Sequence, residues 1–292
     1  LYSSRIAYNA PVSAEQHVDV FRVSAQGTVA LIQTFPTLYQ TGPRSIAVRP
    51  DGKFLYLSTC GGNRSDAGIQ IYAIATDGTL TLADKINQTC LYPVVFDPSN
   101  SKLHGIHSFD DFWKIYSTDA LTGKLTLERT VVLPDDPTDI TIRPDGKFAY
   151  IGTAGDESIH AYRLADGVAP AEVQVFSTHD VSLNDYFIRG GVPRAPTALR
   201  MDPAGRNLYI NIPCYNAILA MTSNAETGVL SLVQYVEGNL VCDDHQMGSI
   251  SISPDGRRAF ALTGRVFGTA YVVQYEVDPL DGWLTEKRCT RW

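Results

Sequence analysis

Arginine side chains stand beside the ends of three predicted strands, where they could bind an oxyanion. Arg44 starts one strand, Arg194 comes just before another, and Arg265 follows a third. A guanidinium in such a place can clamp a carboxylate or polarise a carbonyl oxygen. We therefore treat these arginines as candidate catalytic residues; the alternative for each is a salt bridge between neighbouring structural units.

Two histidines stand next to carboxylates and could move a proton near neutral pH. His107 is followed by Asp110 and Asp111, and His245 follows a pair of aspartates. An imidazole oriented by an adjacent carboxylate can act as general acid or base. Both histidines are candidate catalytic residues, and the alternative is a hydrogen-bonded loop residue.

Four further residues are candidates for binding a substrate. Tyr186 and Tyr215 could donate a hydrogen bond to a developing oxyanion, or pack on neighbouring loops. Asp139 starts a predicted strand, where it could bind a ligand or accept bonds from loop amides. Arg189 and Tyr186 belong to the segment 177–197, the longest departure from the pattern of the chain. Long loops in compact domains are usually functional or disordered, so this segment is either a lid or a solvated excursion.

Metal and nucleotide motifs are absent from the sequence. There is no HExxH, CxxC or EF-hand spacing, no phosphate-binding glycine loop and no Gly-x-Ser-x-Gly elbow. We therefore expect no cofactor and no metal ligands. Calcium is the alternative, because its scattered carboxylate and amide ligands leave no motif.

Composition excludes several classes of partner. The 292 residues carry a net charge of -7 and 44% apolar residues, without a run of Lys or Arg. This argues against nucleic acid and anionic membranes as partners, and no apolar run is long enough to span a bilayer. We expect a single domain over residues 1–292 that binds a small molecule.

The candidate residues are positioned by a repeat. Arg44–Thr59 reads RSIAVRPDGKFLYLST and Thr138–Thr153 reads TDITIRPDGKFAYIGT. Each is a strand, a tight turn and a second strand rich in aromatic residues. Weaker copies of this hairpin cover Ala198–Ile212, Ser249–Thr263 and Tyr92–His107.

A second hairpin lies between these copies, with a glycine in its turn. IQIYAIATDGTLTL, from Ile69, is an example, and the turn glycines are Gly27, Gly78, Gly123, Gly167, Gly228 and Gly282. Two hairpins make a four-stranded unit of strands a, b, c and d, and repetition of such a unit predicts an all-β propeller. The pattern favours six blades, with seven as the alternative, and the first blade lacks a readable inner strand a.

Alternation of strand direction separates two faces. The a–b and c–d turns lie on one face, and the longer b–c and d–a loops lie on the other, where binding groups tend to sit. Both sequons, at Asn63 and Asn87, fall in the second blade and would accept glycans in a secretory pathway.

Four cysteines occupy matching places on the loop-bearing face. We expect the bridges Cys60–Cys90 and Cys214–Cys242, the pairing that joins loops of a single blade, with Cys289 free. The alternative is buried thiols in a cytosolic protein. Bridges and sequons together favour secretion or the lumen of the secretory pathway, and a first residue other than Met is consistent with removal of a leader.

The hairpins GPRSIAVRPDGKFLYLST, APTALRMDPAGRNLYINI and SISISPDGRRAFALT resemble those of lactonase-type propellers, along nearly the whole chain. That family includes 6-phosphogluconolactonase-like and carboxy-muconate-cyclising enzymes, usually with seven blades. Secreted fungal propeller cyclases, among them hetero-Diels–Alderases, look similar. The resemblance implies a cofactor-independent enzyme that cyclises or isomerises a small carbonyl- or carboxylate-bearing molecule. The alternatives are a lactone hydrolase, with or without calcium, and a non-catalytic secreted propeller that binds carbohydrate or protein.

Overall fold

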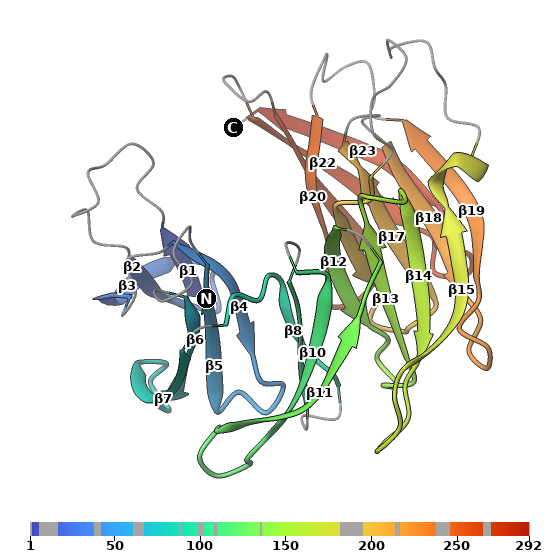
Figure 1. Cartoon of the computed structure of the whole chain (residues 1–292). Helices are drawn as coiled ribbons and strands as arrows, with labels where there is room; N and C mark the ends of the chain where they lie inside the picture. The colour runs from blue at the N-terminus through green and yellow to red at the C-terminus, as the bar shows by residue number, and fades with distance from the viewer. Residues whose placement is uncertain are drawn as a thin grey trace. The chain divides into compact units, whose positions relative to one another are not determined.

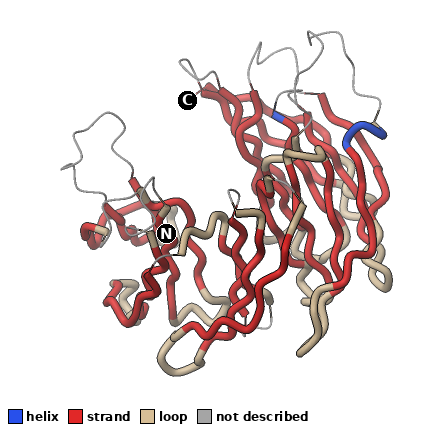
Figure 2. The backbone as a smooth tube through the Cα atoms, in the orientation of Figure 1, coloured by secondary structure: helices blue, strands red, loops and turns tan. Residues whose placement is uncertain are grey.

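The part of the chain that the computed structural model describes is all-β apart from short 3-10 helical segments, such as η2 (Thr178–Asp180) (Figure 2). The structure describes residues 2–5, 17–37, 42–60, 67–87, 89–98, 102–107, 110–134, 136–181, 195–213, 217–237, 246–264 and 270–291. By its contacts the chain divides into two compact units. Unit 1 comprises Leu1–Ser108 and Phe112–Thr130, and unit 2 comprises Phe109–Asp111 and Val131–Trp292.

Unit 1 contains three antiparallel sheets (Figure 1). The first sheet has three strands: β1 (Tyr2–Arg5), β2 (His17–Val23) and β3 (Val29–Pro36). Blade two comprises β4 (Pro43–Val48), β5 (Phe54–Thr59), β6 (Gly68–Ile74) and β7 (Leu80–Asn87). Blade three comprises β8 (Val94–Phe96), β9 (Lys102–His107), β10 (Phe112–Thr118) and β11 (Leu125–Val132).

Unit 2 contains three four-stranded antiparallel sheets. Blade four comprises β12 (Pro137–Ile142), β13 (Phe148–Thr153), β14 (Ser158–Arg163) and β15 (Ala171–Ser177). Blade five comprises β16 (Ala198–Met201), β17 (Asn207–Ile212), β18 (Ala217–Ser223) and β19 (Leu230–Glu237). Blade six comprises β20 (Gln246–Ile252), β21 (Arg258–Gly264), β22 (Ala270–Val277) and β23 (Leu284–Arg291).

The predicted propeller of four-stranded blades is confirmed, but six complete blades are not present in the described chain. There are five four-stranded blades, and the first sheet has three strands. The count differs because the first repeat supplies strands b, c and d only, as its sequence indicates. Among the described residues no helix is long and apolar enough to cross a membrane.

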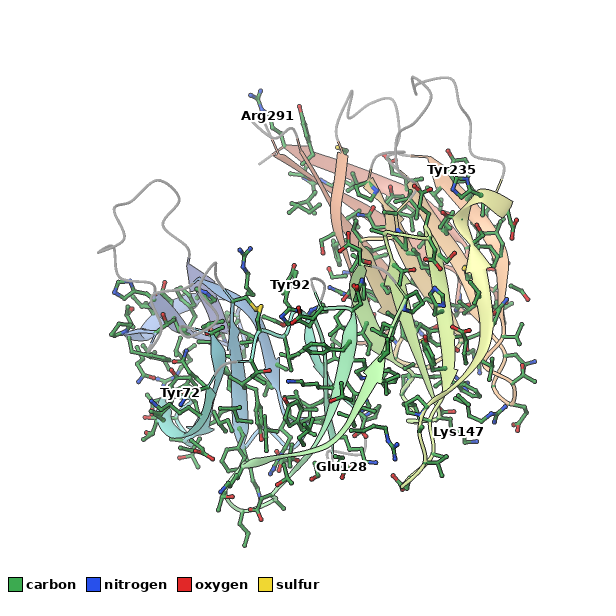
Figure 3. The ribbon with its side chains drawn as sticks, viewed as in Figure 1. Tyr72, Tyr92, Glu128, Lys147, Tyr235 and Arg291 are labelled. Carbon is green, nitrogen blue, oxygen red and sulfur yellow. A yellow bond between two sulfur atoms is a disulfide. The ribbon has the colours of Figure 1, made fainter. Side chains whose placement is uncertain are left out.

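The second strand of a blade is buried on both faces, unlike the outer strands. Every residue of β5, β13 and β17 is buried, whereas five of the eight residues of β7 and of β11 are exposed. The cause is packing of each sheet between two neighbours. Tyr72, for example, packs with Leu55 and Leu57 in the core between the first sheet and blade two (Figure 3).

A tyrosine in the second strand joins a blade to the next one. The hydroxyl of Tyr56 donates to the carbonyl of Gly123 in the c–d turn of blade three, over 2.7 Å. Tyr150 and Tyr209 donate in the same way to Gly228 and Gly282, over 3.1 and 3.0 Å. The aromatic residue that the repeat places after the Pro-Asp-Gly turn is therefore a joint between blades.

The turn glycine is required by close approach as well as by backbone conformation. Gly228 has a φ of +76°, and a Cβ added there would lie 2.2 Å from the ring of Phe148 in blade four. Gly27 has a similar φ of +81°, but nothing lies within 4 Å of its added Cβ. Substitution of Gly27 by alanine would therefore cost only the positive φ, whereas substitution of Gly228 would add the steric clash with Phe148.

We predict that Gly228→Ala destabilises the protein more than Gly27→Ala. A left-handed alanine costs about 1–2 kcal/mol at either site, and the contact with Phe148 adds about 1–3 kcal/mol at Gly228 alone. Urea unfolding of both variants measures the difference. Equal losses of unfolding free energy would show that the turn of blade five can move away from Phe148 without cost.

Candidate functional site

The third residue of the inner strand a accepts a hydrogen bond from the next blade in blades two and four. In blade two the hydroxyl of Ser45 accepts the backbone N–H of Val94, over 3.1 Å. In blade four Asp139 takes this place, and its Oδ2 accepts the N–H of Leu199 over 2.8 Å. A neutral serine is therefore sufficient for this hydrogen bond between blades, and the bond does not require the negative charge of Asp139.

Asp139 is buried, and three donors surround its carboxylate. Oδ1 accepts the N–H of Ile140 over 2.9 Å, and Oδ2 accepts the N–H of Leu199 and Nη1 of Arg200, the latter over 2.7 Å. Burial raises the pKa of Asp139, against the opposing effects of Arg200 and the two amides. Since every contacting group donates, the geometry is that of an ionised carboxylate paired with Arg200.

Arg200, in strand a of blade five, is the partner of Asp139 and was missed in the sequence. Its Nη1 also donates to the carbonyl of Leu199 over 2.7 Å, and its side chain is 42% exposed. In the repeat this position holds Ala47, Val95, Thr141 and Ser251 in the other blades. Comparing equal positions of the copies would have found Arg200, because every other copy carries a small or aliphatic residue there.

The register confirms that these five positions are equivalent. Arg200 pairs with Tyr209 in strand b, just as Ala47 pairs with Tyr56 and Thr141 with Tyr150. In a propeller, strand a is the strand nearest the central channel. Blade five alone therefore presents an arginine at this point of its inner strand.

Arg44 and His107 lie in unit 1, at the loop-bearing ends of their strands. Arg44 is the second residue of β4 and is exposed. His107 ends β9 and is buried, with its ring stacked on Phe112 at 4.8 Å between centroids. Asp111 has a positive φ, and its carboxylate accepts the N–H of Asp136 within unit 2.

The other predicted site residues lie outside the described residues. They are Arg194, His245, Arg265, Tyr186, Arg189 and Tyr215, together with Asn63, Cys214 and Cys242. Their roles stay predictions. Asn87 is described, as the exposed last residue of β7.

Both described ends of the segment 177–197 are fixed to the blades. At its start, Thr178 donates from its N–H and its hydroxyl to the carbonyl of Glu157, over 3.0 and 2.7 Å. At its end, the carbonyl of Pro196 accepts the hydroxyl of Thr138, and the N–H of Thr197 donates to Asn211 over 3.0 Å. The segment therefore leaves from blade four and returns beside Asp139.

The predicted Cys60–Cys90 disulfide is present, with the Cα atoms 4.9 Å apart. The expectation that Cys289 is free is wrong, because Cys289 is disulfide-bonded as well. Its partner lies outside the described residues. The chain has five cysteines and Cys60 pairs with Cys90, so a disulfide at Cys289 is incompatible with the predicted Cys214–Cys242 bridge.

His160 has a structural role. His160 is buried, and its Nδ1 and Nε2 lie 2.7 and 2.9 Å from carboxylate oxygens of Glu172 and Asp156. With both ring nitrogens occupied, His160 ties strands β14 and β15 to the turn that precedes β14.

Among the described residues no group of three or more His, Cys, Asp or Glu side chains could hold a metal ion.

His104 occupies the position in blade three that tyrosine holds in blades two, four and five. Its Nδ1 accepts the indole N–H of Trp113 over 3.2 Å, so the neutral ring carries its proton on Nε2. Nε2 is buried and has no hydrogen-bond partner among the described residues, with Asp97 Oδ2 4.0 Å away. Burial, with a smaller effect of Lys102, lowers the pKa of His104 to about 3.

The comparisons with known proteins agree with the fold. Four-stranded antiparallel blades with joined neighbours define a β-propeller. Residues 5–138 match the family described as Lactonase, 7-bladed beta-propeller, which confirms the resemblance to lactonase-type propellers.

Two curated relatives and one solved structure illustrate the likeness. The chain is 25% identical over 177 residues to Antigen Lp49 of Leptospira interrogans, covering 58% of this chain and 36% of that protein. It is 29% identical over 136 residues to a 6-phosphogluconolactonase of Enterobacter, covering 46% of this chain and 35% of that one. The periplasmic gluconolactonase PpgL of Pseudomonas aeruginosa has a TM-score of 0.74 at 16% identity, over 94% of this chain and 77% of that chain. The matches thus span about a third of each curated relative.

We predict that acid destabilises the protein partly through His104. In the unfolded chain His104 has an ordinary pKa near 6.5 and binds a proton below that pH, whereas in the folded protein it stays neutral down to its lowered pKa. Stability is therefore lost as the pH falls from about 6.5 toward 3, by about 1.4 kcal/mol per pH unit. His104→Gln keeps an acceptor for Trp113 and should show a shallower loss between pH 6.5 and 4.5 in urea unfolding. Parallel curves for the two proteins would contradict this.

We also predict that Asp139→Ala destabilises more than Asp139→Ser. Serine keeps an acceptor for the N–H of Leu199, as Ser45 does for Val94, whereas alanine leaves that buried N–H unpaired at a cost of about 1–3 kcal/mol. Ser45→Ala is the matched control and should show a similar cost. Equal stability of the two Asp139 variants would mean that this joint contributes nothing.

Proposed function

We propose that the protein is an enzyme that hydrolyses a small lactone. The observation that carries the proposal is the guanidinium of Arg200, held on an inner strand by buried Asp139. The match of residues 5–138 to the Lactonase family, and the names of the lactonases among the relatives, support this reaction class.

Arg200 would act on the ring carbonyl. Attack of water on a lactone places negative charge on the carbonyl oxygen, and N–H donors fixed beforehand stabilise that charge. Asp139 fixes the guanidinium, and its own oxygens already accept three hydrogen bonds, so it orients Arg200 rather than taking a proton from water. His245 remains the proposed carrier of that proton.

Ring closure is the finer proposal, because hydrolysis and lactonisation are the same reaction in opposite directions. A donor that stabilises the oxyanion of one direction stabilises that of the other. Lactonising ring closure would therefore use the same arginine, and another cyclisation or isomerisation would use it where negative charge develops on a carbonyl oxygen. Assays in both directions, with and without a calcium chelator, separate these chemistries from a calcium-dependent lactonase.

We predict that Arg200→Ala lowers kcat/KM for a hydrolysed lactone about 100- to 1000-fold, because one donor to the oxyanion is lost. Arg206, exposed in the a–b turn of the same blade, gives the control variant Arg206→Ala, which should keep full activity. The measurement is a panel of γ- and δ-lactones followed by acid release, with circular dichroism to show that both variants are folded. Unchanged activity of Arg200→Ala would remove Arg200 from the reaction. Absence of turnover across the panel and in the reverse direction would favour a binding protein.

A further inference from the structure

We propose that the Nε–Nη2 edge of Arg200 is a carboxylate-binding subsite, so that the ligand of this protein carries a carboxylate. The proposal deepens the proposed function and rests on it for the identity of the ligand as a substrate. The subsite itself rests on the hydrogen bonds of Arg200 and on its place in the repeat.

The hydrogen bonds of Arg200 use one end of the guanidinium and leave one edge open. An arginine has five N–H donors, two of them on Nη1. Nη1 makes two bonds, to Oδ2 of Asp139 and to the carbonyl of Leu199, each over 2.7 Å. Nε and Nη2 make no bond to any described residue, so three donors remain. Nε–H and one N–H of Nη2 form the planar fork that matches a carboxylate with two parallel bonds, and the second N–H of Nη2 is left for the ring carbonyl.

The guanidinium of Arg200 is fixed in position before a ligand binds. Asp139 is itself fixed by the N–H groups of Ile140 and Leu199, in strands a of blades four and five. Its carboxylate therefore positions Nη1 between two adjacent inner strands. A guanidinium ordered in advance loses less conformational freedom on binding than a free arginine side chain does.

The charges favour a group that carries a single negative charge at the open edge of Arg200. Asp139 already balances the charge of Arg200, so the pair is neutral as a whole. A carboxylate gains the two directed bonds of the fork with little excess repulsion. A phosphate dianion would meet the additional repulsion of Asp139, since like charges at short range disfavour each other. We therefore assign the subsite to a carboxylate and not to a phosphate.

Binding of succinate, detected at the Nε–H of Arg200, tests the subsite directly. Nitrogen-15 NMR of the full chain would follow the arginine Nε–H signals during titration, and Arg200→Lys would assign the one that belongs to Arg200. We expect saturable shifts of that signal with succinate, smaller ones with inorganic phosphate, and none with neutral succinamide. In calorimetry, Arg200→Lys should bind succinate at least tenfold more weakly, because lysine keeps the charge but lacks the fork.

Two controls make the result decisive. Arg206→Ala, an exposed arginine of the same blade, should bind succinate like the natural protein. Arg200→Gln should lose binding while remaining folded by circular dichroism. Succinate binding that survives in Arg200→Gln, equal shifts with succinamide, tighter binding of phosphate, or no shift of the Arg200 signal would each overturn the subsite.

Failure of the subsite is distinguishable from failure of the proposed function. In the natural protein, a γ-lactone that bears a ring carboxylate should have a lower KM than the same ring without the carboxylate. In Arg200→Lys, the KM values of the two lactones should become similar. Turnover of both lactones without that advantage leaves the lactonase and removes the subsite. Succinate binding that depends on Arg200, without turnover of any lactone, leaves the subsite and removes the lactonase.

Discussion

The hydrogen bond from a strand-b tyrosine to the turn glycine of the next blade is the interaction on which the arrangement of neighbouring sheets depends. It recurs at Tyr56, Tyr150 and Tyr209, and it requires a carbonyl brought so close that the turn residue has no room for a Cβ. Both faces of a blade are buried, so a sheet has no stable form without its neighbours. The arginine of the Arg-Pro-Asp turn adds a second joint, since Arg143 donates to the carbonyls of Gly205 and Ala225 in blade five, over 2.7 and 3.0 Å. The repeated Pro-Asp-Gly hairpin therefore has a structural role, and its recurrence indicates the fold rather than the chemistry of the protein.

Departures from the repeat carry the information that its recurrence does not. Three positions illustrate this: Asp139 replaces a serine, Arg200 replaces a small or aliphatic residue, and His104 replaces a tyrosine. The first two substitutions form one ion pair across adjacent inner strands. The third places a neutral imidazole where blades two, four and five have a tyrosine hydroxyl, and makes that place sensitive to acid. Because the repeated copies share one backbone geometry, each copy serves as the reference for the others.

Much of the fold could be predicted from the sequence, and much less of the site. The Pro-Asp-Gly hairpins and the turn glycines predict the strands, because a positive φ and alternating apolar residues have local causes. All six predicted turn glycines do have a positive φ. The blade count was less secure, since an incomplete first sheet contains no inner strand to read. Asp139 was found because it starts a strand, but its pairing with Arg200 depends on contact between strands 60 residues apart and has no local signal. The pairing of Cys289 was missed for the same reason, whereas Cys60–Cys90 follows from the matching ends of two strands in one blade.

The cost of the Asp139–Arg200 pair argues that it is kept for function. Burying a carboxylate costs several kcal/mol before its partners compensate, and buried ion pairs often contribute little net stability. Blade two achieves the same joint to its neighbour with a neutral serine, so the charge of Asp139 is not needed to hold two blades together. What the carboxylate adds is the fixed position of Arg200, whose remaining donors point to no described residue of the protein. Violations of a local rule without a structural gain concentrate at functional sites. A charge that the scaffold does not require, on the strand that faces the channel of a propeller, is accordingly the feature of this chain that most needs a ligand to explain it.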